Sequence, residues 1–368
     1  MAELPLPSLE IENFRAFKHL TIEKLGRVNL IVGKNSVGKT CLLEAILLYA
    51  NRLNPNIIKQ LLVIRETFLR PATFQSESRV DAIPFIKRLF NNNELIIGST
   101  TARIGQNNAK NQYTISVNYY TVSQNSPEQI RVPKIIDQAE LPYTENVNLG
   151  LTVSGCEQEQ RIYSLDKFIT DNIHPPEKDA IPCTVVPGNG LNPEFTTAFW
   201  GGIALTSKED NVLAALSLII PDIQRINMVA LAGNEQNRFF IAKLKRYDEP
   251  VSLTRLGDGV TRALHISLAL VNSGNGILLI DEFENGLHHG VQAELWRLVF
   301  RVAHELNIQV FATTHNWDCV EAFQQAAQED QNEEAMLIRL QRQGENIVAV
   351  SYDERELMIA AREHIEVR

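Results

Sequence analysis

The sequence has few cysteines and no long hydrophobic stretch. Its 368 residues include four cysteines, and none stands in the CxxC spacing of a zinc knuckle or redox pair. Neither a disulfide framework nor a structural zinc site is indicated, and the cysteines fit a reducing cytoplasm. No apolar run reaches the roughly 18 residues that a membrane-spanning helix needs. The first 20 residues carry acids where a signal peptide needs a basic start, so we expect a cytoplasmic protein with no membrane partner.

An excess of positive charge is also missing. The chain has 35 Lys and Arg against 44 Asp and Glu, a net charge of −9, and 44% hydrophobic residues. This composition is typical of globular proteins and excludes a largely disordered chain. The acidic balance argues against a protein that coats DNA, although a local basic patch could still bind phosphates. There is no internal repeat and no sustained heptad pattern, which excludes a long coiled-coil arm.

Strands and helices alternate at both ends of the chain, which predicts an α/β core around a parallel sheet. Residues 28–32 form a short apolar strand that runs into glycine, and a helical pattern follows from Gly38. Residues 277–280 and 308–313 predict two more buried strands with a helix between them. Residues 337–350 predict a hairpin, and a closing helix is expected over 353–365.

The middle of the chain is harder to assign. Thr114–Thr121 alternates as a strand does, and Leu95–Ile97 is expected to form another strand. The stretch 123–190 is rich in Pro, Asn, Gln and Glu and predicts loops and short strands. Ser207 and Asp210 have the spacing of a capping box, which predicts the start of a helix.

A glycine-rich segment between a predicted strand and a predicted helix matches GxxxxGKT/S. Its residues are Gly33, Lys34, Asn35, Ser36, Val37, Gly38, Lys39 and Thr40. Glycines let the backbone N–H groups turn toward phosphate oxygens, and the helix N-terminus adds partial positive charge. Lys39 would reach the β- and γ-phosphates, and the Thr40 hydroxyl would ligate Mg²⁺. A chance glycine turn is the alternative, but the position between strand and helix favours a phosphate loop.

Two further segments place polar residues at strand ends. The strand Ile277–Ile280 delivers Asp281 and Glu282 to its carboxyl end, where ligands bind in open α/β sheets. Asp281 would support the metal, and Glu282 would act as general base on a water. His315 ends the next strand and could reach the γ-phosphate or that water. The alternatives are a solvated acidic turn and a structural histidine.

The segment Leu256-Gly257-Asp258-Gly259-Val260 places two glycines before an apolar helix. Such a helix start also favours anions. Because the chain already has one phosphate loop, a second anion-binding turn suggests a site completed across a dimer. The alternative is a helix-start turn without a ligand.

Together these segments resemble the ABC-type ATPase heads of the RecF, SMC and OLD (overcoming lysogenisation defect) group. The shared order is Ile11-Glu12-Asn13-Phe14-Arg15, the phosphate loop, a glycine signature, LLIDE and TTH. The run from Asp281 to His289 is similar to the DExExxLH of OLD-type and related AAA-family ATPases. The resemblance implies a P-loop NTPase fold with a mixed sheet lobe and a helical lobe that carries the signature. It implies one head over 1–368, divided into a phosphate-loop half (1–52), lobe strands with a helical insertion (53–250), and a signature, Walker B and switch-histidine half (251–368).

By this resemblance, ATP and Mg²⁺ bind at the phosphate loop and at Asp281, while Glu282 and the switch histidine His315 are catalytic. Gly257 and Gly259 of one subunit would contact the nucleotide of the other, and Leu287-His288 would lie in the D-loop between the sites. Arg15, in the family's NFR start, is expected to approach the phosphates. The signature is Leu-Gly-Asp-Gly where the family has Leu-Ser-Gly-Gly. The Q-loop glutamine stays open between Gln60 and Gln75.

The resemblance implies an ATPase that dimerises on ATP and regulates a separately encoded effector, such as a Toprim-type nuclease or toxin, in anti-phage defence or DNA maintenance. Only about 50 residues follow His315, too few for the Toprim domain of OLD nucleases, so we expect a head without its nuclease. The alternative is a RecF-like DNA-binding repair ATPase, for which Lys243-Leu244-Lys245-Arg246 is the basic candidate. A transporter ATPase is disfavoured by the DExExxLH run, and a GTPase or kinase by the lack of an NKxD base reader.

Overall fold

The computed structural model of the chain is built around a six-stranded sheet that is parallel except at one edge. The described residues are 3–64, 82–107, 111–122, 133–144, 146–155, 160–168, 177, 179–231, 234–329, 334–353 and 356. In spatial order the strands are β16 (Asn346–Asp353), β15 (Ala335–Gln343), β3 (Val28–Val32), β14 (Gln309–Thr313), β13 (Ile277–Ile280) and β9 (Cys183–Val186). The predicted parallel α/β core and its strands are confirmed, and β9 joins it from the middle of the chain.

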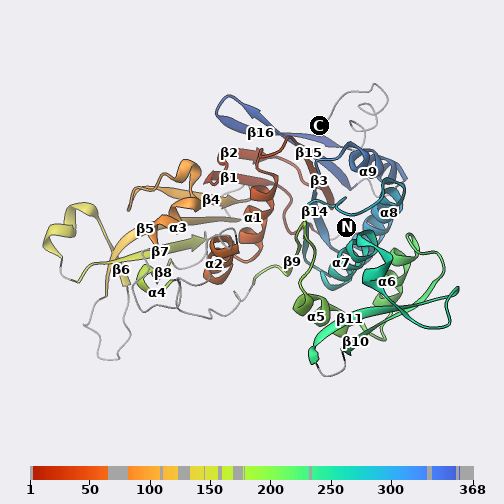
Figure 1. Cartoon of the computed structure of the whole chain (residues 1–368). Coiled ribbons are helices and arrows are strands. Elements are labelled where there is room, and N and C mark those ends of the chain that lie inside the picture. The colour runs from red at the N-terminus through yellow and green to blue at the C-terminus, as the bar shows by residue number, and fades with distance from the viewer. Residues whose placement is uncertain are drawn as a thin grey trace.

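Alternate residues of the parallel strands face two separate cores. In β3, Val28 and Leu30 pack on one face, and Ile31 packs on the other. The first face is covered by α7 (Asp258–Asn272), α8 (His289–Glu305) and α9 (Trp317–Glu329), and the second by α1 (Lys39–Ala50) (Figure 1). Because helices cover both faces, these strands are apolar at nearly every position, as the sequence shows.

A second sheet extends the α1 side of the molecule into an antiparallel lobe. The order of its strands is β2-β1-β4-β5-β7-β8, with β6 also paired to β5. Its strands are β1 (Leu9–Phe14), β2 (Phe17–Ile22), β4 (Thr101–Gly105), β5 (Gln112–Val122), β6 (Pro133–Ile136), β7 (Asn148–Gly155) and β8 (Arg161–Ser164). The helices on this side are α2 (Pro55–Ile64), α3 (Ile83–Ile86) and α4 (Leu165–Phe168).

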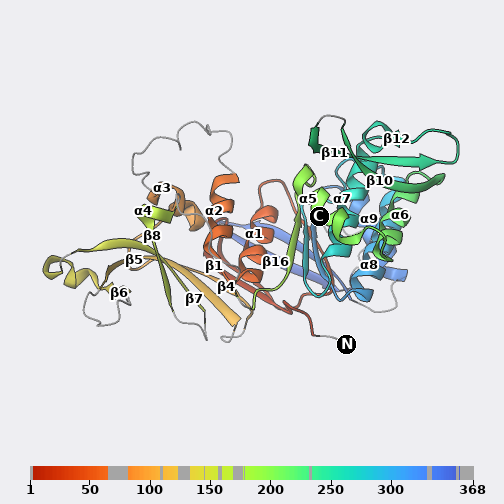
Figure 2. The ribbon, with the colours of Figure 1, turned by 90° about the horizontal axis from the view of Figure 1, so that it is seen from below.

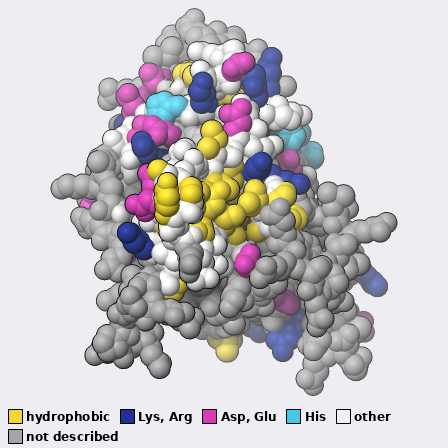
Figure 3. All heavy atoms as spheres, turned by 90° about the vertical axis from the view of Figure 1, so that its left-hand side faces the viewer, with side chains coloured by type: hydrophobic (Ala, Val, Ile, Leu, Met, Phe, Trp, Pro, Cys, Tyr) yellow, Lys and Arg dark blue, Asp and Glu magenta, His cyan; other side chains and the backbone are white. Residues whose placement is uncertain are grey.

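The predictions for this lobe are only partly right. The strand expected at Thr114–Thr121 is confirmed within β5, but Leu95–Ile97 lies in a loop and turn, so that prediction was wrong. The outer end of the lobe presents hydrophobic side chains between charged ones (Figure 3). In this lobe Ile96 and Tyr143 are large hydrophobic residues with 65% and 89% of their surface exposed.

A third, smaller sheet and two helices form the lobe on the opposite side of the parallel sheet (Figure 2). These elements are α5 (Pro193–Ile203), α6 (Lys208–Ser217), β10 (Ile223–Leu231), β11 (Asn234–Leu244) and β12 (Val251–Ser252). A helix begins after Ser207 as predicted, but the capping box is wrong. The Ser207 backbone is helical and its side chain makes no capping bond, whereas the Glu209 carboxylate accepts from the Leu205 N–H at 2.9 Å.

The closing helix expected over 353–365 lies almost wholly outside the described residues. None of the described helices has an apolar stretch of the length that spanning a membrane requires.

Candidate active site

Three strand ends bring the predicted site residues together at the carboxyl edge of the parallel sheet. The phosphate-loop segment follows β3, Asp281 and Glu282 follow β13, and His315 follows β14. They surround a cavity of about 600 Å³. Its lining residues are Ala16, Asn35, Ser36, Gly38, Lys39, Thr40, Cys41, Asp281, Glu282, Thr313 and His315. Of the predicted loop residues, Gly33 and Lys34 are not in this lining, and Val37 packs its side chain into the core.

The phosphate-loop segment adopts the conformation that its glycines allow. Gly38 caps α1 with a φ of 101°, and a Cβ there would lie 3.1 Å from the Phe17 ring. Because glycine has no side chain to cap the first helical turn, this N-terminus is of the kind that binds anions. The Lys39 ammonium donates to the carbonyls of Gly33 at 2.6 Å and Lys34 at 3.2 Å, which folds it over the loop.

Hydroxyl and carboxylate oxygens converge beside this loop. Thr40 Oγ1 donates to Asp281 Oδ2 at 3.1 Å, and Thr313 Oγ1 donates to Asp281 Oδ1 at 2.6 Å. Oxygen donors of this kind are the ligands that Mg²⁺ prefers, usually one or two together with water and phosphate oxygens. The donor set therefore fits a magnesium nucleotide.

Glu282 lies in the left-handed region of backbone space, with a φ of 51°. For a residue with a Cβ this conformation costs about 1–2 kcal/mol and persists only where the surroundings hold it. Its N–H donates to Thr313 Oγ1 at 2.9 Å. Its carboxylate lies against Gly188 in the loop after β9, and Asn285 Nδ2 is 3.4 Å from Oε2.

His315 is oriented by a buried acid. Its backbone N–H donates to Glu284 Oε1 at 3.3 Å, and its Nδ1 lies 3.4 Å from the same oxygen. Glu284 is 8% exposed, whereas the His315 side chain is 51% exposed. A proton on Nδ1 satisfies this contact, and Nε2 then remains for a further group: it accepts a hydrogen bond when the ring is neutral and donates one when the ring is charged.

The predicted signature glycines do not line the phosphate cavity. Gly257 caps α7 with a φ of 109°, and Gly259 packs so closely that a Cβ would lie 2.7 Å from the Gly286 carbonyl oxygen. Asp258 lines a different cavity of about 250 Å³, between the start of α7 and the loop after β9. Within one chain, therefore, the signature and the phosphate loop belong to different cavities.

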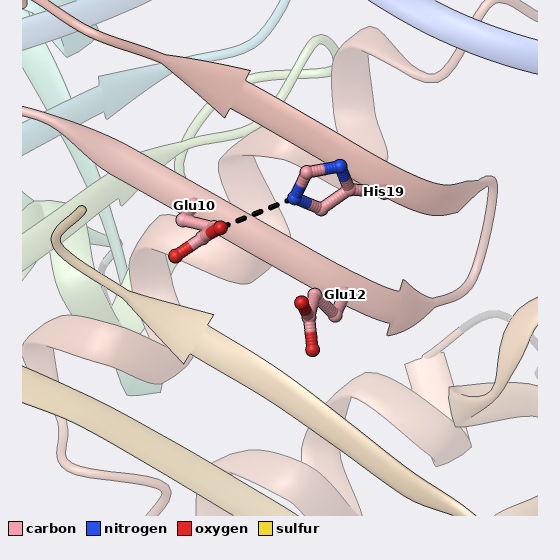
Figure 4. A group of neighbouring side chains, drawn as sticks. All are labelled: Glu10, Glu12 and His19. Atoms are coloured by element: carbon pink, nitrogen blue, oxygen red, sulfur yellow. Dashed lines mark hydrogen bonds and ion pairs between the residues drawn. The ribbon is translucent and has the colours of Figure 1, made fainter. Parts of the chain in front are cut away.

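A separate charged group lies on the outer face of the antiparallel sheet (Figure 4). One ligand atom each from Glu10, Glu12 and His19 lies within 4.8 Å of the others, so the group could hold a metal. However, Glu10 contacts His19 at 3.1 Å and Gln112 at 2.8 Å, while Glu12 pairs with Arg103 at 2.9 Å. These contacts already give both carboxylates hydrogen-bonding partners, so the group is better described as a surface hydrogen-bond network with one ion pair, between Glu12 and Arg103.

Two family models match successive parts of the chain. One, described as an AAA ATPase domain, matches residues 5–180. The other is an AAA domain whose description links it to the AbiEii toxin of a type IV toxin–antitoxin (TA) system, and it matches residues 188–318.

Known proteins agree with these models. An ATP/GTP phosphatase of Helicobacter pylori is 24% identical over 351 residues, which cover 88% of this chain and 89% of that protein. The DNA replication and repair protein RecF of Clostridioides difficile is 51% identical over 43 residues, 12% of each chain. An SMC head bound to the C-winged helix domain of ScpA has a TM-score of 0.51 at 10% identity, covering 96% of this chain and 99% of that one. An SMC head with an extended coiled coil, bound to the C-terminal domain of ScpA from Pyrococcus furiosus, has a TM-score of 0.50 at 9% identity, covering 98% and 99%.

Over most of its length the chain is thus similar to AAA ATPase domains. Its fold is that of the SMC heads, a P-loop NTPase fold, as the order of motifs predicted.

The structure alters two expectations, one for Arg15 and one for the Q-loop candidate Gln60. Arg15 pairs with Glu44 on α1 at 3.1 Å and also donates to the Leu61 carbonyl, and it is absent from the lining of the phosphate cavity. Gln60 is exposed on α2, away from that cavity, and Gln75 lies outside the described residues. β9 is one of the two neighbours of β13 in the sheet, and Asn189 in the loop after β9 lines the cavity that Asp258 also lines.

Sequence reasoning gave no role to three residues that organise the site: Thr313, Glu284 and Arg262. Thr313 was visible as part of TTH, and Glu284 as the third acid of the DExE run. Arg262 stands on α7 among buried apolar residues, which was the one signal that it has an internal partner.

Proposed function

We propose that the ATPase hydrolyses ATP at the carboxyl edge of the parallel sheet, with Mg²⁺ held near Thr40 and Asp281. The contact between Thr40 and Asp281, 3.1 Å long, carries this proposal, because it joins the phosphate loop to the Walker B strand within one cavity. Lys39 binds the phosphates, and the Gly38 turn presents the helix N-terminus to them. Glu282 accepts the proton of the attacking water, and His315 Nε2 holds that water or the γ-phosphate. The bound Mg²⁺ supplies positive charge that offsets the charge of the phosphates.

Phosphate release measured against Mg²⁺ concentration tests this assignment. Asp281→Asn removes a carboxylate charge from the metal side of the site, so we expect it to raise the Mg²⁺ requirement and slow hydrolysis by at least about tenfold. The matched control is Asp137→Asn, at an exposed helix start in the antiparallel lobe. Equal Mg²⁺ dependence in the two variants would contradict the metal site.

The same proposal includes an ATP-dependent homodimer, in which Gly257 and Gly259 of one subunit complete the phosphate site of the other. The support is geometric, since Asp258 at the start of α7 lines a different cavity from the phosphate loop of its own chain and stands between two glycines. Asp258→Arg adds bulk and positive charge at this start and should block dimers formed with ATP. Sedimentation with and without ATP measures this, and an unchanged dimer would point to a different interface.

For the biological role, we propose that the ATPase regulates a separate effector, such as a Toprim-type nuclease or a toxin, in anti-phage defence or DNA maintenance. The toxin–antitoxin description of the second family model agrees with this setting. The SMC head similar to this chain is itself bound to a domain of a second protein.

The alternative role is that of a RecF-like DNA-binding repair ATPase, which the local match to RecF favours. The basic candidate Lys243–Arg246 gives it little support. The Lys243 ammonium donates to the carbonyls of Tyr247 and Asp248, and Arg246 pairs with Asp222 at 3.4 Å. Two of its three cations therefore already have partners in their own lobe.

Capture from host extract separates these roles. The Glu282→Gln protein is held with ATP and Mg²⁺, and Lys39→Ala serves as the control that does not bind ATP. We expect a nuclease or toxin-like protein to be enriched over the control. Enrichment of nucleic acid without such a protein would favour the repair role.

A further inference from the structure

The strained backbone at Glu282 requires a group that holds it. Thr313 secures the N–H of Glu282, but the carbonyls of Asp281 and Glu282 turn away from the strand ladder toward α7. Both accept hydrogen bonds from a single side chain on that helix.

That side chain is Arg262, which is 4% exposed. Its Nη2 donates to the Asp281 carbonyl at 2.7 Å and to the Glu282 carbonyl at 2.8 Å. Its Nη1 donates to the Pro187 carbonyl at 2.7 Å, in the loop after β9 where Gly188 faces the Glu282 carboxylate. One guanidinium therefore joins the ends of β13 and β9 to α7, the helix that begins with the predicted signature.

The guanidinium keeps its charge in this environment. Burial lowers the pKa of Arg262 to about 10, against the opposing effect of the nearby carboxylates of Glu284, Asp281 and Glu282. The side chain is therefore protonated at neutral pH and donates charge-assisted hydrogen bonds, which are stronger than neutral ones. The planar fork of arginine can reach three carbonyls at fixed angles, which the single ammonium of lysine cannot do as well.

We propose that Arg262 is a positioning residue for ATP hydrolysis: it binds the carbonyls of Asp281 and Glu282, holds Glu282 in its strained conformation and so directs the Glu282 carboxylate. This inference rests on the proposed role of Glu282 as the base. Because Arg262 lies one helical turn after Gly257–Gly259, a displacement of the start of α7 reaches Glu282 through the same three hydrogen bonds.

A second buried arginine provides a matched control. Arg27 is also 4% exposed, and it pairs with Glu334 at 2.6 Å and Asn307 at 3.0 Å at the amino end of the sheet. Replacing either arginine by glutamine removes a buried charge and its hydrogen bonds. Only Arg262 touches the backbone of the proposed base.

The experiment compares Arg262→Gln, Arg262→Lys and Arg27→Gln for kcat, for the dissociation constant of a fluorescent ATP analogue, and for Tm. We expect Arg262→Gln to lower kcat by about 10- to 100-fold, the range that a small misplacement of a catalytic group produces. Nucleotide affinity should change by less than about threefold, since the phosphate loop is untouched, and Arg262→Lys should recover part of the rate. Arg27→Gln should lower Tm but leave kcat unchanged.

A double variant distinguishes this inference from the proposed function. If Arg262 acts through Glu282, adding Arg262→Gln to Glu282→Gln should slow the enzyme little further, because residues that act as a unit are not additive. Full additivity, or an equal loss of kcat in Arg27→Gln, would overturn the positioning role while leaving Glu282 as the base. If neither Arg262 variant folds, the residue is structural and the inference fails. Normal turnover of Glu282→Gln alone would instead overturn the proposed base, and the inference with it.

Discussion

The two ends of the parallel sheet both carry buried polar side chains, but they use them differently. At the amino end, Asn29 is fully buried and bonds Gly26 and the Val310 carbonyl, and Gln309 bonds the backbone of Leu6 and Gly26. Arg27 is neutralised by Glu334. Each of these groups is matched by a partner from the same chain, as buried polar groups must be if they are to stabilise a fold.

At the carboxyl end, the polar groups face a cavity of about 600 Å³. Lys39 is folded over backbone carbonyls, and Thr40 and Asp281 bond each other where a metal would bind. Glu282 occupies a strained backbone conformation. One sheet therefore uses similar chemistry in two ways: the hydrogen-bond networks at its amino end are closed and stabilise the fold, whereas the groups at its carboxyl end are open and can bind a ligand.

The largest effect is expected at the open end, where Lys39→Ala should abolish ATP binding. The ammonium is the main cation among the cavity-lining residues, so its loss removes the charge that opposes the phosphates. Stability should change little, since Lys39 is only partly buried at the start of α1. Calorimetric titration with ATP measures the binding. Tight ATP binding by Lys39→Ala would contradict the phosphate-loop assignment.

The closed end predicts the reverse pattern for Asn29→Ala. Removing this amide leaves the Gly26 backbone and the Val310 carbonyl without their partner, at a cost of about 2–4 kcal/mol in the free energy of unfolding. The kcat per folded molecule should not change. Urea unfolding and an activity assay on the same sample test both statements. A loss of kcat at unchanged stability would remove the distinction between the two ends.

A smaller effect on kcat is expected from Gly188→Ala. A Cβ at Gly188 would lie 2.8 Å from Glu282 Oε2, so the flexible carboxylate must move aside. We expect kcat to fall several-fold, on the order of 3- to 30-fold, with unchanged ATP affinity. The matched control is Gly201→Ala on α5, where a Cβ meets nothing within 4 Å. Equal activity of both variants would show that Glu282 is not used in the position seen here.

The smallest effect concerns pH. Burial, and then the charge of Arg262, lower the pKa of His265 to about 4, and its Nδ1 accepts from the Leu191 N–H at 3.2 Å. In the unfolded chain the pKa of this histidine is near 6.5. As pH falls from about 6.5 to 4, the unfolded state therefore binds a proton that the folded state does not, and the folded state loses stability over this range. His265→Gln should show a shallower fall of Tm between pH 7 and pH 5. Parallel curves for the two proteins would exclude this contribution.

The sequence predicted the regular parts of the molecule well because their patterns are local. Val28–Val32 and Gln309–Thr313 are apolar strands covered on both faces, and the phosphate-loop segment has a fixed spacing between strand and helix. What it did not predict depends on contacts between distant segments. Leu95–Ile97 has the composition of a strand but forms a loop and a turn. β9 joins the parallel sheet although about 150 residues separate it from β3 in the sequence.

The same reason explains which site residues were missed. Asp281, Glu282 and His315 stand in short motifs, whereas Arg262 acquires its role only when α7 packs against the ends of β13 and β9. Arg15 was expected to approach the phosphates because of its position in a motif. A position in the sequence does not establish a contact, and the Arg15 side chain pairs with Glu44 instead.

The most direct test is a single-turnover measurement on two glutamate variants, one from each end of the sheet. ATP is bound to Glu282→Gln and to Glu334→Gln, and the rate of phosphate formation is compared with that of the unmodified protein. If the open end hydrolyses ATP, Glu282→Gln binds ATP normally and is slowed by about 10²–10⁴-fold, the contribution of a positioned base, while Glu334→Gln reacts at the normal rate with a lower Tm. Hydrolysis by Glu282→Gln at the normal rate would contradict the account.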